Sequence, residues 1–404
     1  MTNREAAIKI VKRLRAGGFE ALLAGGCVRD MLLDKKPKDY DVATNAHPKQ
    51  VTALFSRTIT VGAQFGVVVV LLGGQQIEVA TYRSDMDYPD GRRPQRIVFT
   101  DARRDAQRRD FTINGMFFDP LENTVIDYVG GQRDLKRQII QAIGKAEERF
   151  AEDHLRMLRA IRFACRFQFA IACPTWRAIR RNAAKIQRIS AERIAAELEM
   201  ILTDPNRRQG LQLVRDSGLL IRILPEVSET QFTLGLQVVS QLPRKCSYVL
   251  ALSALLTDCG EKKAGHICRR MKTSNDLRKQ VQWLVGNRRP FLDAVPMSKG
   301  PLKQWLAQPL FETLVQLNRC YLRSVGQSEG KLRMLRRQIN NIGSEPIAPP
   351  RLLDGHELIR LGAVPGPLVG RLAEELYLAQ LENSVRQKSQ ARRWVKQWLQ
   401  KHKE

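Results

Sequence analysis

Long hydrophobic runs are missing from this chain of 404 residues. No stretch of about 18 consecutive apolar residues occurs, so the sequence predicts no membrane-spanning helix. The first residues, MTNREAAIKIVKRLRAGG, carry charges too evenly for the apolar centre of a secretory signal peptide. We therefore expect a soluble, cytoplasmic protein with no membrane partner. Its length suits two to four domains, because a domain typically has about 150 residues.

Closely paired cysteines are also missing. The seven cysteines are odd in number and widely spaced, unlike the cysteines of a disulfide framework or a structural zinc site. Cys259, His266 and Cys268 lie close together in the sequence, but no C-x2-C pair accompanies them. We therefore expect reduced cysteines with structural roles and no zinc site. Repeats of fixed period and low-complexity tracts are absent as well, which argues against a solenoid.

Acidic residues are few relative to basic ones. The chain has 67 Lys plus Arg against 41 Asp plus Glu, a formal net charge of +26, which a protein handling small neutral molecules does not need. A polyanion is the natural partner of such a protein. Charge can also serve solubility, but added acidic residues do so better than basic ones. A membrane surface fits less well, because the basic residues are spread along the whole chain.

The pattern of the chain changes near residue 145. Before it, strand-like runs alternate with Gly-rich turns, and a helix-like segment follows Gly26; the runs are LLAGG, DYDVAT, FGVVVVLL, QQIEVATYR and TVIDYVGG. After it, apolar positions recur with the helical period in RMLRAIRFACRF, ERIAAELEMIL and QGLQLVRDSGLLIRIL. The segment NIGSEPIAPPRLLDG predicts another boundary near residue 345. The sequence thus predicts an α/β or α+β domain followed by an all-α remainder.

Two aspartates lie close together in the segment KDYDV. Residues two apart in a strand point to the same side, so Asp39 and Asp41 would present two carboxylates together. Two neighbouring negative charges favour a cation, and a pair of Mg²⁺ ions is a known arrangement for nucleotidyl transfer. Taken alone, the D-x-D pattern is weak evidence, because surface strands and turns often contain it.

The residues before this pair suit a triphosphate. The apolar run LLA leads into Gly25 and Gly26, and a helix-like segment containing Arg29 follows. Glycines allow phosphate oxygens to approach the backbone, and Arg29 adds a positive charge. An ordinary strand-to-helix turn would show the same two glycines. Glu78 lies between apolar neighbours, where a carboxylate either faces solvent on a strand or completes a metal site.

The segment at 25–48, GGCVRDMLLDKKPKDYDVATNAHP, resembles the signature of the class II branch of the polymerase-β-like nucleotidyltransferases. This family includes the bacterial CCA-adding, CC-adding and A-adding enzymes and the bacterial poly(A) polymerases. Other segments match its motifs in the family's order: the flexible loop at 88–94, the ribose and phosphate motif at 108–115, the hinge motif at 127–135, the base-reading motif at 152–156 and the neck helix at 192–198. Agreement of six ordered motifs by chance is very improbable.

The resemblance implies an α+β fold. A nucleotidyltransferase head with a mixed sheet and helices (1–145) would precede an all-α neck with the base-reading motif (146–205), a helical body (206–345) and a helical RNA-binding tail (346–404).

In the tail, Trp394 and Trp398 lie four residues apart on one helical face, a spacing more typical of a packing stripe than of an RNA-stacking platform.

The resemblance also implies the roles of single residues. Asp39 and Asp41 would bind two Mg²⁺ ions, and Glu78 would be the third catalytic carboxylate. The residues expected to bind the nucleotide are Gly25, Gly26, Arg29, Arg109, Asp110, Asn114, Asp153, Arg156, Arg159 and Arg162. Asp110 would accept the ribose 2′-hydroxyl group. Outside the motifs, a surface charge cluster would explain Arg108, Arg109 and Asp110. A solvated helix face would explain Arg159 and Arg162.

Asp153 and Arg156 are expected to select the incoming base in place of a template. Residues three apart lie on one face of a helix, so a carboxylate and a guanidinium can contact one base edge together. The same spacing also occurs in internal ion pairs at helix starts, which are common on helix surfaces.

The implied function is template-independent addition of C, C and A to the 3′ end of tRNA from CTP and ATP, with release of pyrophosphate. The segment TVGAQFGVVV at 60–69 resembles the CCA-adding pattern more than that of poly(A) polymerases. Alternatives are A-only addition, poly(A) polymerisation and a catalytically inactive RNA-binding homologue. A small-molecule nucleotidyltransferase fits neither the charge nor the helical half. No obligatory protein partner is expected.

Overall fold

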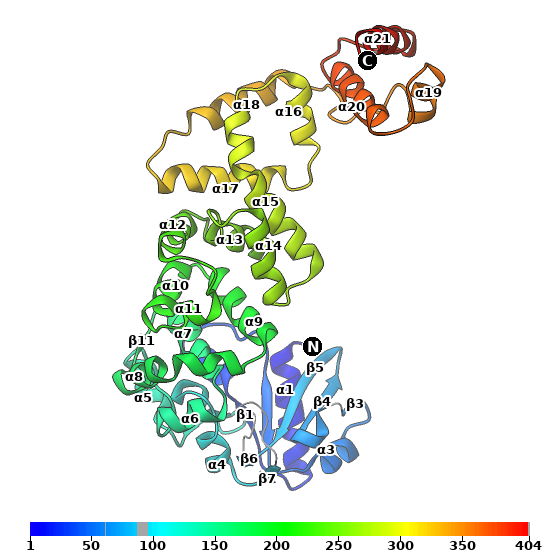
Figure 1. The fold of residues 1–404 in the computed structure, drawn as a ribbon. Helices are drawn as coiled ribbons and strands as arrows, with labels where there is room; N and C mark the ends of the chain where they lie inside the picture. Colours follow the sequence, from blue (N-terminus) through cyan, green and yellow to red (C-terminus); the bar gives the residue numbers. More distant parts are fainter. Residues whose placement is uncertain (61, 87–95, 403–404) are drawn as a thin grey trace. The chain divides into compact units, whose positions relative to one another are not determined.

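The computed structural model describes residues 1–60, 62–86 and 96–402. They form two compact units, one comprising Met1–Val227 with Arg270–Thr273 and the other Ser228–Arg269 with Ser274–Glu404 (Figure 1). The predicted flexible loop at 88–94 and Val61 lie outside the described residues. The division after Val227 falls inside the predicted body, so the four-part domain boundaries remain a prediction.

The first unit is built around a mixed seven-stranded sheet in the order β3-β4-β5-β2-β1-β8-β9. Its strands are β1 (Ala21–Ala24), β2 (Asp41–Thr44), β3 (Thr58–Ile59), β4 (Val67–Leu72), β5 (Gln75–Thr81), β8 (Met116–Asp119) and β9 (Thr124–Asp127). β2 and β5 pair in parallel, and the other neighbouring strands pair antiparallel. The predicted mixed sheet is therefore confirmed. The sequence patterns had not indicated β8, which joins β1 to β9.

The buried positions of the strands explain the sheet. All four residues of β1 are buried, which is typical of a central strand covered on both faces. β5 alternates instead, with Ile77 and Val79 buried and Gln76 and Glu78 exposed. Helix α1 (Asn3–Ala16) begins with a capping box between Thr2 and Glu5, and the residues that it buries include Ile10 and Leu14. It contacts β1, β2 and β5 and lies beside the sheet in Figure 1.

The remaining elements of the first unit are mainly helical. The helices are α2 (Gly26–Leu32), α3 (Pro48–Leu54), α4 (Ala102–Gln107), α5 (Gly131–Lys136), α6 (Ala146–Glu152), α7 (Arg156–Phe167), α8 (Cys173–Asn182), α9 (Ala191–Leu202), α10 (Arg207–Asp216) and α11 (Leu220–Ile223). Short 3-10 helices are η1 (Ala63–Phe65), η2 (Thr112–Asn114) and η3 (Ala183–Arg188). β6 (Arg83–Met86) pairs with β7 (Arg96–Phe99), and β10 (Ile139–Ile140) with β11 (Ala170–Ile171). The helices predicted from RMLRAIRFACRF and ERIAAELEMIL are α7 and α9.

The second unit is helical. Its helices are α12 (Glu229–Ser240), α13 (Tyr248–Leu255), α14 (Glu261–Arg270), α15 (Asn275–Ala294), α16 (Lys299–Leu306), α17 (Phe311–Ser324), α18 (Gly330–Ile342), α19 (Gly355–Arg360), α20 (Pro367–Leu381) and α21 (Lys388–Lys401). The break between α18 and α19 coincides with the Pro-rich segment expected near residue 345. None of the helices among the described residues combines the length and apolar character needed to cross a membrane.

The last three helices share a small hydrophobic core. Leu358, Leu372 and Trp398 are buried in it, and Trp394 packs against it. The indole N–H of Trp398 donates to Glu375 at 2.6 Å. The two tryptophans therefore have a packing role, as their spacing had suggested. Basic side chains of α21, including Arg392, Arg393 and Lys396, are exposed.

Candidate functional site

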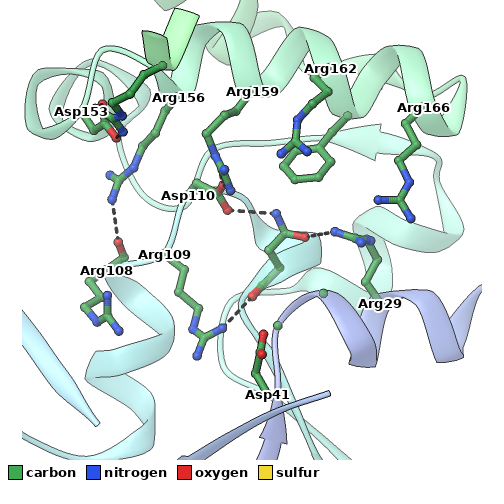
Figure 2. Close-up of a pocket in the computed structure, with 15 residues that line it drawn as sticks. Arg29, Asp41, Arg108, Arg109, Asp110, Asp153, Arg156, Arg159, Arg162 and Arg166 are labelled. Atoms are coloured by element: carbon green, nitrogen blue, oxygen red, sulfur yellow. Dashed lines mark hydrogen bonds and ion pairs between the residues drawn. The ribbon is translucent and has the colours of Figure 1, made fainter. Parts of the chain in front are cut away.

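A cavity of about 520 Å³ opens in the first unit between the ends of the central strands β1 and β2 and helix α7 (Figure 2). β1, α2 and β2 form one wall, and the residues after α4 together with α7 form the other. The lining residues are Gly25, Gly26, Arg29, Asp41, Arg108, Arg109, Asp110, Asn114, Asp153, Arg156, Arg159, Arg162, Phe163, Arg166 and Arg193. Eight of them are arginines and three are aspartates, so the cavity suits a polyanion.

The two glycines bring the backbone close to the arginines. Gly25 has φ 73° and ψ −124°, a conformation that side chains rarely tolerate. A Cβ atom at this position would come within 2.8 Å of the Nη1 atom of Arg109. A glycine is therefore required at position 25 both by the backbone and by the approach of Arg109.

Arg29 is buried on α2, in the wall that also contains β1 and β2. Its guanidinium donates to Oδ1 of Asp30 from Nε and Nη2, at 2.9 and 2.7 Å, and to Oδ1 of Asn114. Burial lowers the pKa of Arg29, and the negative charge of Asp30 opposes this effect. Asp30 also accepts from Arg166 on α7 at 3.2 Å. The ion pairs of Asp30 thus connect the two walls of the cavity.

The predicted catalytic carboxylates lie together, although only part of the cluster reaches the cavity. The register of β2 with β5 pairs Val42 with Val79, so Asp41 and Glu78, each one residue earlier, lie on the same side of neighbouring strands. Burial raises the pKa of Asp41 to about 6, and the charge of Glu78 adds to the effect. Asp41 lines the cavity.

Asp39 departs from the expected placement. β2 begins at Asp41, so Asp39 lies in the irregular segment before the strand rather than in it. The alternation nevertheless extends back to this residue, since Tyr40 and Val42 are buried while the side chains of Asp39 and Asp41 are accessible to solvent, that of Asp41 within the enclosing cavity. The negative charge of Asp39 also contributes to the raised pKa of Asp41, which places the two carboxylates near each other.

The carboxylates suit a divalent cation that takes its remaining ligands from water and the substrate. Within the described residues, no three His, Cys, Asp or Glu side chains converge closely enough to hold a metal ion by themselves. Mg²⁺ commonly binds one or two carboxylates and takes its other ligands from water and substrate phosphates. Burial is the main cause of the raised pKa of Asp41, the charges of Glu78 and Asp39 add to it, and the charge of Arg109 opposes it. A cation bound beside Asp41 would favour the ionised carboxylate.

Arg108 and Arg109 are held by an aspartate that the sequence patterns had not singled out. Asp105 on α4 is 2% exposed and accepts from Arg108 at 2.7 Å and from Arg109 at 2.9 Å. Burial opposes the ionisation of Asp105, but the charges of Arg109 and Arg108 outweigh it and lower the pKa. The two arginines are therefore oriented cavity residues and not a loose surface cluster.

Asp110 is buried and has four hydrogen-bond donors around its carboxylate. It accepts from the backbone N–H of Phe111 at 2.8 Å, from Asn114 at 3.0 Å, and from Nε and Nη2 of Arg159 at 3.0 and 2.7 Å. Burial opposes its ionisation, but the charge of Arg159 and the hydrogen bonds lower its pKa to about 2. Contact with a ribose hydroxyl would therefore require one of these donors to be exchanged.

The arginines of α7 form a row along the cavity (Figure 2). Arg159 pairs with Asp110, and Arg162 pairs with the buried Glu197 of α9 at 2.7 Å. The side chain of Arg162 is 12% exposed, so a solvated helix face is the wrong interpretation. Arg166 continues the same face four residues later, a spacing that would have revealed it in the sequence.

The structure corrects the geometry expected for Asp153 and Arg156. Asp153 is not on a shared helix with Arg156, because α6 ends before it and its backbone is extended, at φ −147°. Arg193 of α9 holds the Asp153 carboxylate at 2.7 Å, while Arg156 pairs with Glu152. Both predicted residues still line the cavity. Their side chains form neither a pair on one helix face nor the internal ion pair that was the alternative.

Comparison with known proteins identifies the family. The Poly A polymerase head domain family matches residues 21–141, and the family described as the probable RNA and SrmB-binding site of polymerase A matches residues 168–230. The chain is 34% identical over 385 residues to the CCA-adding enzyme of Lactobacillus johnsonii, with 94% of each chain covered. It is 43% identical over 216 residues to the CCA-adding enzyme of Geobacillus kaustophilus, covering 53% of each.

A solved structure agrees with these relatives over nearly the whole chain. The crystal structure of the Bacillus stearothermophilus CCA-adding enzyme in complex with CTP is similar with a TM-score of 0.74 at 27% identity. The match covers 99% of this chain and 98% of that chain. With a relative that is 34% identical along 94% of both sequences, the chain belongs to the family of CCA-adding enzymes.

Proposed function

We propose that this chain adds C, C and A to the 3′ end of tRNA from CTP and ATP, without a template. The observation that carries the proposal is the cavity, which eight arginines line together with Asp41 and two glycines. A cavity so rich in guanidinium groups is suited to a triphosphate. The charge of +26 on the whole chain fits an RNA partner. We further infer a cytoplasmic location, where tRNA and nucleoside triphosphates occur.

The arginines would bind the triphosphate from both walls. Arg29 on α2, Arg109 after α4, and Arg159 and Arg162 on α7 would contact phosphate oxygens from different sides of the cavity. Gly25 and Gly26 would let the phosphates lie against the backbone. Bound in this way, the nucleotide presents its α-phosphorus to the RNA 3′-hydroxyl group, and pyrophosphate leaves after attack.

Asp39 and Asp41 would hold two Mg²⁺ ions, with Glu78 as a third carboxylate beside them. When bound, these ions would stabilise negative charge on the attacking and leaving oxygens. The role of Asp41 is supported by its position in the cavity and by the neighbouring charge of Glu78. Glu78→Ala is expected to impair addition severely, because it removes one of the charges that attract the cations.

Asp153 and Arg156 would select the base, and Asp110 with Asn114 would contact the ribose. The carboxylate can accept the amino group of cytosine or adenine, while the guanidinium donates to N3 and O2 of cytosine or to N1 of adenine. Uracil and guanine place a carbonyl where that amino group should be, at a cost on the order of 1 to 3 kcal/mol for each unmade bond. Arg193, which holds Asp153, would set the direction of the carboxylate.

One assay tests the proposal. Purified enzyme receives tRNA transcripts that end before CCA, after the first C and after CC, with each nucleotide supplied separately. We expect C on the first two transcripts and A on the third. Addition to the CC-ended transcript only would instead indicate an A-adding enzyme, and long A tails on unrelated RNA would indicate a poly(A) polymerase. Binding without any addition would indicate an inactive RNA-binding homologue.

A further inference from the structure

Two stacked phenylalanines of α7 lie among the cations of the cavity. The rings of Phe163 and Phe167 have centroids 6.1 Å apart and an interplanar angle of 12°, because residues four apart share one face of a helix. Phe163 lines the cavity, and Phe167 is buried. Neither ring is among the site residues predicted from the sequence.

Three guanidinium groups surround the ring of Phe163. The Cζ atoms of Arg29, Arg159 and Arg162 lie 5.3, 5.5 and 4.3 Å from its centroid. A cation within about 6 Å of an aromatic centroid is attracted by the electron density of the ring face. These arginines come from two different helices, α2 and α7, so Phe163 connects the two walls of the cavity.

The ring of Phe167 extends the same arrangement. The Cζ atom of Arg29 lies 4.7 Å from its centroid, that of Arg166 lies 5.1 Å away, and Nζ of Lys35 lies 5.0 Å away. Arg29 thus lies near both rings. Phe163 and Phe167 together therefore contact cations along this part of α7.

The arginines repel one another in this arrangement. Burial lowers the pKa of Arg162 to about 10; Glu197 opposes the fall, and the positive charges of Arg159 and Arg166 add to it. Carboxylates compensate part of this repulsion, but they also neutralise charge and occupy N–H groups. A ring face attracts the cation without using any of its in-plane N–H groups, so the N–H groups that Asp30, Asn114, Asp110 and Glu197 leave unoccupied stay available to a ligand.

We infer that Phe163 is a positioning residue for the nucleotide triphosphate, which holds Arg29, Arg159 and Arg162 so that their N–H groups converge on the phosphates. The inference rests on the proposed function, because it takes the triphosphate of CTP or ATP as the ligand. Loss of the ring face weakens nucleotide binding in the ground state and the transition state alike. The expected signature is a raised KM with a smaller change in kcat.

The sharpest test keeps the shape of the Phe163 ring and lowers the electron density on its face. Phe163 is replaced in the full-length enzyme by phenylalanines carrying increasing numbers of fluorine atoms, which withdraw density from the ring face. Phe111 receives the same series as a control, since its buried ring meets Phe163 edge-on at 5.8 Å. Addition of C to a tRNA lacking CCA gives KM for CTP and kcat, and thermal unfolding reports on folding.

The expected result is a graded rise of KM, reaching about tenfold for the most fluorinated ring at position 163. The Phe111 series should leave KM unchanged, and Phe163→Leu should match the high end of the Phe163 series. A flat KM series at position 163 would overturn the inference, as would an equal rise in the Phe111 series. Failure of the unmodified enzyme to add C would instead refute the proposed function and not this inference.

Discussion

Replacing Asp110 by Asn tests whether an ion pair across the cavity stabilises the site. The carboxylate is 9% exposed and accepts two hydrogen bonds from Arg159, so Asp110→Asn removes a buried charge with little change of shape. Its amide group would place N–H donors against the N–H donors of Arg159 or Phe111. The free energy of unfolding should decrease, and Arg159 should lose the contacts that orient it.

The magnitude follows from the pKa of Asp110, which falls from an ordinary 3.8 to about 2 in the folded protein. Each unit of difference between folded and unfolded pKa corresponds to about 1.4 kcal/mol, giving about 2 kcal/mol as an upper value. Arg159 is 34% exposed, and solvent screening reduces this to about 1 to 2 kcal/mol. The folded pKa is depressed, so the contribution is complete above pH 4 and is lost as the pH falls toward 2.

The assay must report on the first unit separately, because unfolding of a protein with two units is not a two-state process. Trp176 is the one tryptophan of the first unit among five in the chain. Urea titrations followed through the fluorine NMR signal of 5-fluorotryptophan at this position therefore measure the stability of that unit. The wild type and Asp110→Asn are compared at pH 7 and pH 3, with the exposed Glu122→Gln as a control for loss of one charge.

At pH 7 the Asp110→Asn enzyme should be about 1 to 2 kcal/mol less stable than the wild type. At pH 3 this difference should shrink to about half, because the Asp110 carboxylate of the unfolded wild type is then mostly protonated while that of the folded protein is still ionised. The same variant should also show a raised KM for CTP and weaker discrimination against dCTP. A stability difference that is equal at the two pH values would refute the electrostatic argument, since the charge of Asp110 would then contribute nothing.

Three further predictions concern chemistry, RNA binding and selectivity. Asp39→Ala or Asp41→Ala should abolish nucleotide addition while tRNA binding persists in filter assays, because affinity comes from basic side chains; near-normal turnover in either variant would remove that residue from the metal site. Deletion of the residues after 345 should weaken tRNA binding and reduce its salt dependence with little effect on nucleotide KM, and an unchanged salt slope in a folded protein would limit the tail to packing. Asp153→Ala and Arg156→Ala should relax selection among the four nucleotides and lower turnover, whereas full preference for C and A would show that the base is read elsewhere.

Short-range patterns of the sequence were sufficient for much of the fold and for part of the site. The two-residue period of a strand predicted Asp39 and Asp41 on one side. The structure shows the same alternation, even though Asp39 precedes the strand. Arg156, Arg159 and Arg162 lie three residues apart in the sequence and share one face of α7, where all three line the cavity. The glycine at 25 was recognised as a point of close approach. Each of these features depends on the repeat of a strand or helix, or on the conformation of one residue.

The partners of the charged side chains were decided by the tertiary structure. Asp110 meets Arg159 across 49 residues, Asp153 meets Arg193 across 40, and Asp30 meets Arg166 across 136. Asp41 is brought beside Glu78 by the parallel register of β2 and β5. The sequence determined which side chains share a face of one element, because that spacing is set by backbone geometry. Which carboxylate orients which arginine depended on how α7 and α9 pack beside the sheet, and local periodicity does not encode that packing.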